Sequence, residues 1–320
     1  MNDLIDLASA RLGSVVLNAS NEFFAPKDRL ILSAPPIWRE GEYTDRGKWM
    51  DGWETQRRRD VLPGDAGFSQ AHDWCIVRLG AQGLIRRIDV ETTHFKGNHP
   101  ESCAVDACVV SGEDVGRALW QPAIDRSPLV GDSHNVFEAA NVVATHVRLR
   151  IFPDGGVARL RVYGDVLPDW DALRRQGDVD LAAVQNGGRV IECSDMFFGP
   201  RHNLIMPGDA LGMADGWETR RRRAPGHEWT VVKLGAHGTI ARAEVDTTHF
   251  KGNAPAACSL EASTSGAGDW RELLPRSLLT ADRRHTFETA APRIDGVTHV
   301  RLNIFPDGGI ARLRLFGTPA

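Results

Sequence analysis

Short stretches in which apolar and polar residues alternate recur along this chain of 320 residues. Val147, Leu149 and Ile151 fall on one face, with polar residues between them on the other, which is the period of a half-buried strand. Similar stretches at 72–79 and 84–91 predict two strands joined by a glycine-containing turn. Helical periodicity is nearly absent, so the pattern predicts an all-β chain built from β-sandwiches.

A second chain reversal is predicted at 153–156, where Pro-Asp-Gly-Gly has the composition of a hairpin turn. Beyond that turn, Leu160 and Val162 are expected to face the core. By the same alternation, Arg159 and Arg161 are expected to face the solvent.

Three motifs occur twice, in the same order in each half of the chain. They are Asp-Gly-Trp-Glu-Thr followed by arginines (51–59 and 215–223), Thr-Thr-His-Phe-Lys-Gly-Asn (92–98 and 247–253) and Phe-Pro-Asp-Gly-Gly (152–156 and 305–309). A merely solvated charged loop has little reason to keep Glu, Thr and the same arginine run in both copies, so these motifs are the candidates for function.

The repetition divides the chain into two domains. Between the copies, 166–176 is polar, contains a proline and ends in helix-forming residues. We therefore expect a first repeat at 1–166 and a second at 176–320. The first copy alone carries inserted residues immediately before and after its 51–59 segment.

Bulk composition excludes several classes of protein. The formal net charge of -4 gives no reason to expect a nucleic-acid partner. No apolar run approaches the roughly 18 residues of a membrane span, and the acidic start of the chain is unlike a signal peptide. The five cysteines are an odd number, and only Cys103 and Cys258 occupy equivalent positions. Reduced thiols in a cytoplasmic protein are expected, and a homo-oligomer is left open.

Through its doubled motifs the chain resembles the allantoicase family, and the resemblance covers nearly all of it. The resemblance implies two tandem jelly-roll sandwiches of the galactose-binding-like kind. It also implies an enzyme of purine (allantoin) degradation that splits allantoate into ureidoglycolate and urea. Such an enzyme is a hydrolase acting on carbon–nitrogen bonds other than peptide bonds, in linear amidines.

Allantoate would demand both an acid and a base, because urea is a poor leaving group unless it is protonated and the attacking water must lose a proton. Glu54, His94 and Asp51 are the candidates for these roles. The substrate carboxylate calls for a guanidinium fork, for which Arg57 and Arg59 are the candidates, because they share a face of an extended segment.

The remaining arginines of the run are expected to pair with Asp51 or Glu54. Lys96, Asn98 and Trp53 complete the predicted substrate-binding set, and Asn98 can serve ureido N–H and C=O groups at once. The second-repeat equivalents of the predicted site are Asp215, Glu218, Arg221, His249, Lys251 and Asn253. The inserted loops lead us to expect catalysis in the first repeat, because loops beside a motif can close over a substrate.

Other interpretations stay open at this point. His72, His94, Glu54 and Asp51 could supply mixed nitrogen and oxygen ligands to a divalent metal, although no His-x-x-His or Cys-x-x-Cys spacing is present. Nucleotide cofactors and acyl-enzyme chemistry are disfavoured, because their glycine-rich and serine motifs are missing from the sequence. The rival function is a non-catalytic tandem galactose-binding-like module for an acidic ligand, and a third alternative is a structural subunit.

Overall fold

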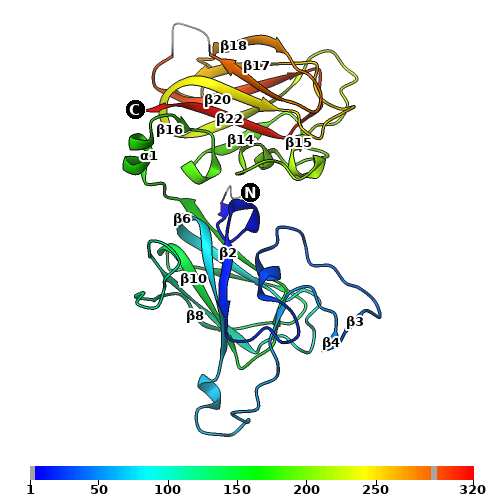
Figure 1. Ribbon diagram of the computed structural model, residues 1–320, viewed down its shortest axis with the longest axis vertical. Coiled ribbons are helices and arrows are strands. Elements are labelled where there is room, and N and C mark those ends of the chain that lie inside the picture. The colour runs from blue at the N-terminus through cyan, green and yellow to red at the C-terminus, as the bar shows by residue number, and fades with distance from the viewer. Residues whose placement is uncertain (1–3, 290–293) are drawn as a thin grey trace. The chain divides into compact units, whose positions relative to one another are not determined.

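The computed structural model of the protein describes residues 4–289 and 294–320. It separates into two compact units, one ending at Leu167 and the other beginning at Pro168 (Figure 1). The short helix α1, Trp170–Gln176, follows this junction.

The first unit is a β-sandwich in which one long strand, β6 (Asp73–Glu91), takes part in both layers. Residues 73–78 of β6 pair with β10 and β2, whereas 83–91 pair with β12 and β9 and only 83 and 84 still pair with β10. The strand order is β1-β12-β6-β10-β7-β8. The other strands are β1 Ile5–Asp6, β2 Val15–Ala19, β3 Tyr43–Thr44, β4 Gly47–Lys48, β5 Trp53–Glu54, β7 Ser102–Cys108, β8 Gln121–Pro128, β9 His134–Glu138, β10 Val143–Phe152, β11 Gly156–Val157 and β12 Arg159–Val166, with 3₁₀ turns at Ala10–Leu12, Lys27–Ile31 and Phe68–Gln70.

The second unit repeats this topology as β13-β22-β16-β20-β17-β18, with β14 and β19 pairing β16. Its strands are β13 Val179–Asp180, β14 Arg189–Cys193, β15 Trp217–Glu218, β16 Glu228–Asp246, β17 Ala257–Ser263, β18 Arg271–Leu278, β19 Arg284–Glu288, β20 Val297–Phe305, β21 Gly309–Ile310 and β22 Arg312–Pro319, with 3₁₀ turns at Val184–Asn186, Arg201–Ile205 and Met213–Asp215. The prediction of two tandem jelly-roll sandwiches is confirmed.

The predicted turn between 72–79 and 84–91 was wrong, because both stretches belong to the single strand β6. The strand bends without ending, and its register against β10 shifts between Ala144 and His146. Gly80 lies so close to the chain that a Cβ there would meet the carbonyl oxygen of Leu12 at 2.5 Å. The glycine therefore permits close packing inside a bent strand and does not reverse the chain.

The predicted hairpin at 153–156 was also wrong. β10 pairs with β6 and β7, whereas β12 pairs with β1 and β6, so the two strands flanking the turn are not partners. Between them, β11 leaves the main sheet and pairs with β5. The segment is thus a crossing between layers, and it brings 153–156 beside the start of the 51–59 motif.

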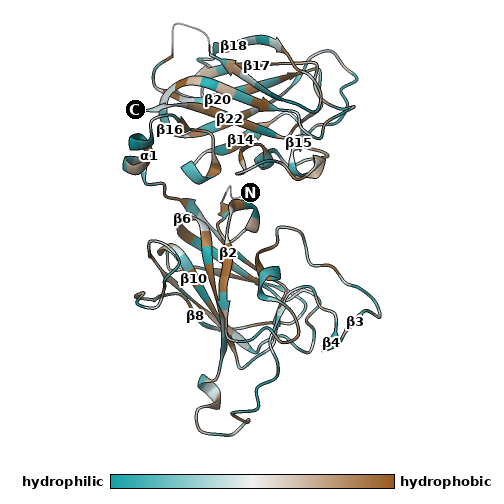
Figure 2. Cartoon of the chain, viewed as in Figure 1, coloured by the Kyte–Doolittle hydropathy of each residue, from teal (hydrophilic) through white to brown (hydrophobic). Residues whose placement is uncertain are grey.

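Alternation along β10 and β12 places the apolar residues in the core as predicted. Leu149, Leu160 and Val162 are fully buried, and Figure 2 shows hydrophobic and hydrophilic positions alternating along strands of both units. The arginines of β12, however, are not solvent-facing: Arg159 is 1% exposed and Arg161 9% exposed. Loops of the first unit supply carbonyl partners for both side chains and the Asp51 carboxylate for Arg159, and strand β1 supplies the Asp6 carboxylate for Arg161.

All five cysteines have free thiols, and burial raises the pKa of Cys103 to about 12. No helix within 4–289 or 294–320 is long and apolar enough to cross a membrane.

Candidate active site

The three doubled motifs of the first repeat meet around one buried aromatic ring. Phe95 is fully buried, and a Cβ at Gly156 would overlap its ring, while one at Gly52 would approach it to 2.8 Å. The backbone of Trp53 pairs with Val157 across β5 and β11. Glycines are needed where the two loops lie against the phenyl ring, which explains why the motifs occur together.

The second repeat builds the same junction from its own copies. Phe250 is fully buried, and Cβ atoms at Gly216 and Gly309 would overlap its ring or approach it closely. Trp217 pairs with Ile310 across β15 and β21. The motifs therefore have a packing role in both repeats, whatever catalytic role they also have.

Trp53 belongs to this frame. It is 0% exposed, and its indole Nε1–H donates a 2.7 Å hydrogen bond to the carbonyl of Asn21. The predicted contact between Trp53 and the substrate was wrong, because a ligand cannot reach this buried ring. Trp217 is equally buried and bonds in the same way to Asp195.

Asp51 also belongs to the frame. Its carboxylate accepts hydrogen bonds from the Arg159 guanidinium at 2.8 and 3.3 Å and from the Ile37 N–H at 2.9 Å. Burial opposes ionisation of Asp51, but these hydrogen bonds and the positive charge of Arg159 outweigh it and lower the pKa of the carboxyl. The expected acid–base role of Asp51 is therefore corrected to one of anchoring the loop at Ile37.

Glu54 has a different environment. It is 8% exposed, and its Oε1 accepts a 2.7 Å hydrogen bond from the Nδ2 of Asn98. Burial raises the pKa of Glu54 above its ordinary value, and the hydrogen bond from Asn98 offsets only part of that effect. A buried carboxyl group with a raised pKa is a candidate for accepting and donating protons.

His94 is held in an uncommon backbone conformation, with φ of 72°. Its N–H donates to Asp132 at 2.8 Å, and Asp132 also pairs with Lys96 at 3.7 Å. The imidazole lies against Trp38, with 5.6 Å between ring centroids, and its Nε2 is 3.4 Å from the carbonyl oxygen of Pro36. Residues kept in such backbone conformations concentrate at functional sites.

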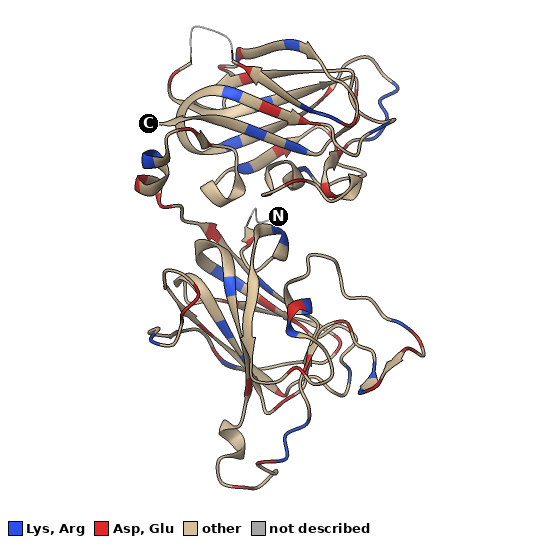
Figure 3. Cartoon of the chain, in the orientation of Figure 1, with Lys and Arg blue, Asp and Glu red and all other residues tan. Residues whose placement is uncertain are grey.

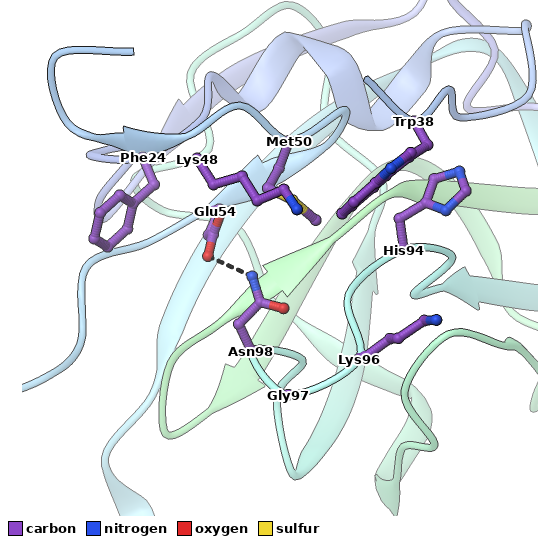
Figure 4. Close-up of a pocket in the computed structure, with 9 residues that line it drawn as sticks. All are labelled: Phe24, Trp38, Lys48, Met50, Glu54, His94, Lys96, Gly97 and Asn98. Carbon is purple, nitrogen blue, oxygen red and sulfur yellow. Dashed lines mark hydrogen bonds between the residues drawn. The ribbon is translucent and has the colours of Figure 1, made fainter. Parts of the chain in front are cut away.

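Glu54, His94, Lys96 and Asn98 line one cavity of about 430 Å³, within the size range of small-molecule sites (Figure 4). Its other lining residues are Phe24, Trp38, Lys48, Met50 and Gly97. In Figure 4, Glu54 and Asn98 lie on one side of the cavity and Trp38 and His94 on the other.

Sequence reasoning missed Trp38, Lys48 and Phe24. Trp38 and Lys48 lie in the loop that carries β3 and β4, which the sequence identified only as an insertion before the 51–59 segment. This loop extends from the sandwich (Figure 1) and carries charges of both signs (Figure 3). An aromatic residue and a lysine inside a repeat-specific insertion were the available signal.

Arg57 and Arg59 do not reach this cavity. They line a separate hollow with Arg58, His72 and Asp73. Of the three arginines, Arg58 forms ion pairs there, with Asp73 at 3.4 Å and with Asp60 at 2.6 Å. The expectation that it would pair with Asp51 or Glu54 was wrong, because the extended segment directs it to the opposite side.

The four candidate metal ligands do not all meet, because Glu54 and His94 line the cavity while His72 and Asp51 lie elsewhere. His72 lies against Phe152 with the two rings tilted and 5.3 Å between their centroids, and Asp51 is paired with Arg159. In the parts of the chain that the structure describes, no group of three or more His, Cys, Asp or Glu side chains could hold a metal ion.

The second-repeat candidates keep part of this geometry. Asn253 donates to Glu218 at 2.6 Å, and His249 has φ of 74° with its Nε2 2.9 Å from the carbonyl oxygen of Ala210. The Nδ2 of Asn253 also lies 3.8 Å from the sulfur of Met213, a contact with no counterpart at Asn98.

The charged second-repeat candidates also follow the first repeat. Lys251 pairs with Asp282 at 3.8 Å, as Lys96 does with its aspartate. Asp215 pairs with Arg312 at 3.0 Å. Arg222 forms an ion pair with the buried Glu228 at 2.7 Å, and Arg221 alternates with it along the arginine run.

Known proteins match this chain over nearly its whole length, and a family model matches its two repeats separately. The family model described as the allantoicase repeat matches residues 5–167 and 179–320. A probable allantoicase of Pseudomonas aeruginosa is 46% identical over 98% of this chain and 96% of its own length, and one of Photobacterium profundum is 47% identical over the same shares. The crystal structure of allantoicase from Saccharomyces cerevisiae superposes with a TM-score of 0.81 at 33% identity, covering 99% of this chain and 93% of that one. The chain belongs to the allantoicase family.

Proposed function

We propose that this protein hydrolyses allantoate to ureidoglycolate and urea, breaking a carbon–nitrogen bond other than a peptide bond in a linear amidine. The observation that carries the proposal is a cavity that joins a buried carboxyl group of raised pKa, Glu54, to His94 and Asn98. These residues come from the motifs that repeat in the chain, and membership of the allantoicase family supports the substrate.

Glu54 is the proposed base. Hydrolysis replaces the bond between the central carbon and a ureido nitrogen by a bond to a water oxygen, so the water must lose a proton. The carboxylate of Glu54 accepts this proton, and its raised pKa makes it a stronger base than an exposed glutamate. Met50 and Phe24 line the same cavity and give it apolar walls.

His94 is the proposed acid. The departing ureido nitrogen must gain a proton to leave as urea, and an imidazolium on the opposite side of the cavity from Glu54 can supply it (Figure 4). The proton taken by Glu54 and the proton given by His94 balance over one turnover. Loss of either group is expected to cost about 10²–10⁴-fold in rate.

Asn98 is the proposed orienting residue. Its Nδ2 is committed to Glu54, which leaves its Oδ1 to accept a hydrogen bond from a ureido N–H. One side chain can thereby fix the base and the substrate relative to each other.

The test is release of urea from allantoate by the purified full chain, without nucleotide or flavin and with and without added divalent metal. Urea and ureidoglycolate should form in equal amounts, and the Glu54→Gln protein serves as the matched control that keeps the fold. If neither condition yields urea while allantoate binds, the chain is a binding module and the proposal fails.

A further inference from the structure

The proposed substrate carries a carboxylate, yet the cavity holds none of the arginines expected to bind it. Arg57 and Arg59 lie in the other hollow of the first repeat. The carboxylate therefore needs another cation, since an unpaired buried charge is costly. His94 is already assigned to protonating the leaving group, so the remaining cations that line the cavity are Lys48 and Lys96.

These two lysines differ in how they are engaged. Lys96 is 78% exposed at its side chain and is paired with Asp132 at 3.7 Å. Lys48 is half-buried and has no acidic partner among the described residues. Its Nζ lies 3.7 Å from the centroid of the Trp38 ring, and Figure 4 shows the side chain extending toward that ring. A cation held by an aromatic face can still accept an anion on its other side.

The position of Lys48 is built into the inserted loop. β3 and β4 form a two-stranded hairpin in which Lys48 pairs with Tyr43. Next to it, the ring of Trp49 is covered by the guanidinium groups of Arg29 and Arg39, at 5.0 and 4.5 Å from the ring centroid. The lysine therefore stands on a packed hairpin whose base is tied to the sandwich by the Asp51 carboxylate.

The equivalent position of the second repeat carries no cation. Asp51 corresponds to Asp215, so Lys48, three residues before it, corresponds to Gly212. The next residue, Met213, places its sulfur near Asn253 instead. The amide and carboxyl groups are thus duplicated, while the charge that a carboxylate requires is present only in the first repeat at this position.

We propose that Lys48 binds the carboxylate of the substrate and so determines that the first-repeat cavity selects a ureido compound bearing an acid group. This inference rests on the proposed hydrolysis of allantoate. The Trp38 ring holds the ammonium in place, and the carboxylate binds to the ammonium from the cavity side. That arrangement orients the central carbon between Glu54 and His94.

The experiment compares Lys48→Met and Lys48→Arg in the full chain, with Lys233→Met as the control. Lys233 is an exposed lysine of β16, so its loss removes the same charge from the other repeat. Lys48→Met should raise the KM for allantoate roughly ten- to hundredfold, the effect of losing a charged hydrogen bond, with a smaller loss of kcat. Lys48→Arg should restore much of the affinity, and Lys233→Met should leave both constants unchanged.

A second measurement separates carboxylate recognition from general damage to the loop. Methylenediurea is allantoate with its carboxylate replaced by hydrogen, and its inhibition constant should be the same in the wild type and in Lys48→Met. Equal weakening of both ligands, or an unchanged KM for allantoate, would overturn the proposal. An Arg57→Met protein that shows the KM effect in place of Lys48→Met would return the carboxylate to the arginine run. If the wild type itself releases no urea, the proposed function fails first and this inference fails with it.

Discussion

In the first repeat an asparagine donates to a glutamate at 2.7 Å, and in the second repeat the equivalent pair is 2.6 Å apart. The neighbouring histidines share the same left-handed backbone, with φ of 72° and 74°. Around this common frame the surroundings differ. Trp38 and Lys48 line the first cavity from the inserted loop that carries β3 and β4, whereas the shorter second-repeat loop brings Met213 to Asn253.

This contrast teaches that duplicated motifs do not by themselves imply duplicated sites. Much of each motif packs in the junction around Phe95 or Phe250, which is built in the same way in both sandwiches. Residues that serve folding persist in both repeats whatever the chemistry. The rim contributed by loops is free to differ, and it decides what a cavity can hold.

The largest difference between the repeats is expected when the glutamate is replaced in each of them in turn. Glu54→Gln should lower kcat/KM for urea release by about 10²–10⁴-fold, because the amide cannot accept the proton of water. Glu218→Gln should have a far smaller effect. Steady-state assays of the two full-length proteins decide the matter. If each variant kept about half of the activity, the repeats would hold equivalent sites, and severe losses in both would point to interdependent copies.

The frame, in contrast, should be equally important in both repeats. Arg159→Met removes the guanidinium from the buried Asp51 carboxylate, and Arg312→Met removes the buried guanidinium that pairs with the partly exposed Asp215. Breaking a buried pair from one side costs about 3–5 kcal/mol, so Arg159→Met should destabilise its unit by that amount and Arg312→Met by up to that amount. Urea unfolding monitored by tryptophan fluorescence measures this cost. A large cost in one repeat and none in the other would contradict a shared frame.

The sequence predicted the fold well because sandwich strands alternate strictly between core and surface. Leu149 and Leu160 could be placed in the core from that period alone. The bent strand β6 and the crossing at 153–156 could not be predicted, because glycine is used there for close packing as well as for turns. Local composition does not distinguish these uses.

Prediction of the site was less complete, for a different reason. Glu54, His94 and Asn98 could be selected because they repeat, and they do line one cavity. Trp53 and Asp51 repeat equally well but serve packing and loop anchoring. Nothing in the sequence separates a residue repeated for folding from one repeated for chemistry. Lys48, by contrast, has no equivalent lysine in the second repeat, so an argument based on repetition could not select it.

Removal of the proposed acid tests the comparison at the histidines. His94→Ala should lower the rate of urea release by at least about a hundredfold, because the leaving nitrogen loses its proton donor. His249→Ala should cost much less, although it occupies the same backbone conformation. Because alanine tolerates a positive φ no better than histidine does, thermal unfolding of both variants controls for instability. A larger loss from His249→Ala than from His94→Ala would reverse the assignment of the working repeat.

The smallest expected effect concerns Asn98, whose replacement should change the pH dependence of the reaction. The hydrogen bond from Asn98 favours the charged form of Glu54 and so opposes the rise in the pKa of Glu54 that burial causes. Asn98→Ala removes that bond and should raise the pKa of Glu54 further. Since the base must be ionised, the acid side of the kcat/KM profile for urea release should move to higher pH, with less than about a tenfold loss on the plateau. Asn253→Ala removes the equivalent bond to Glu218 and should leave the profile where it is. A profile that moved to lower pH in Asn98→Ala, or that moved with Asn253→Ala, would show that Glu54 is not the group whose ionisation limits the reaction.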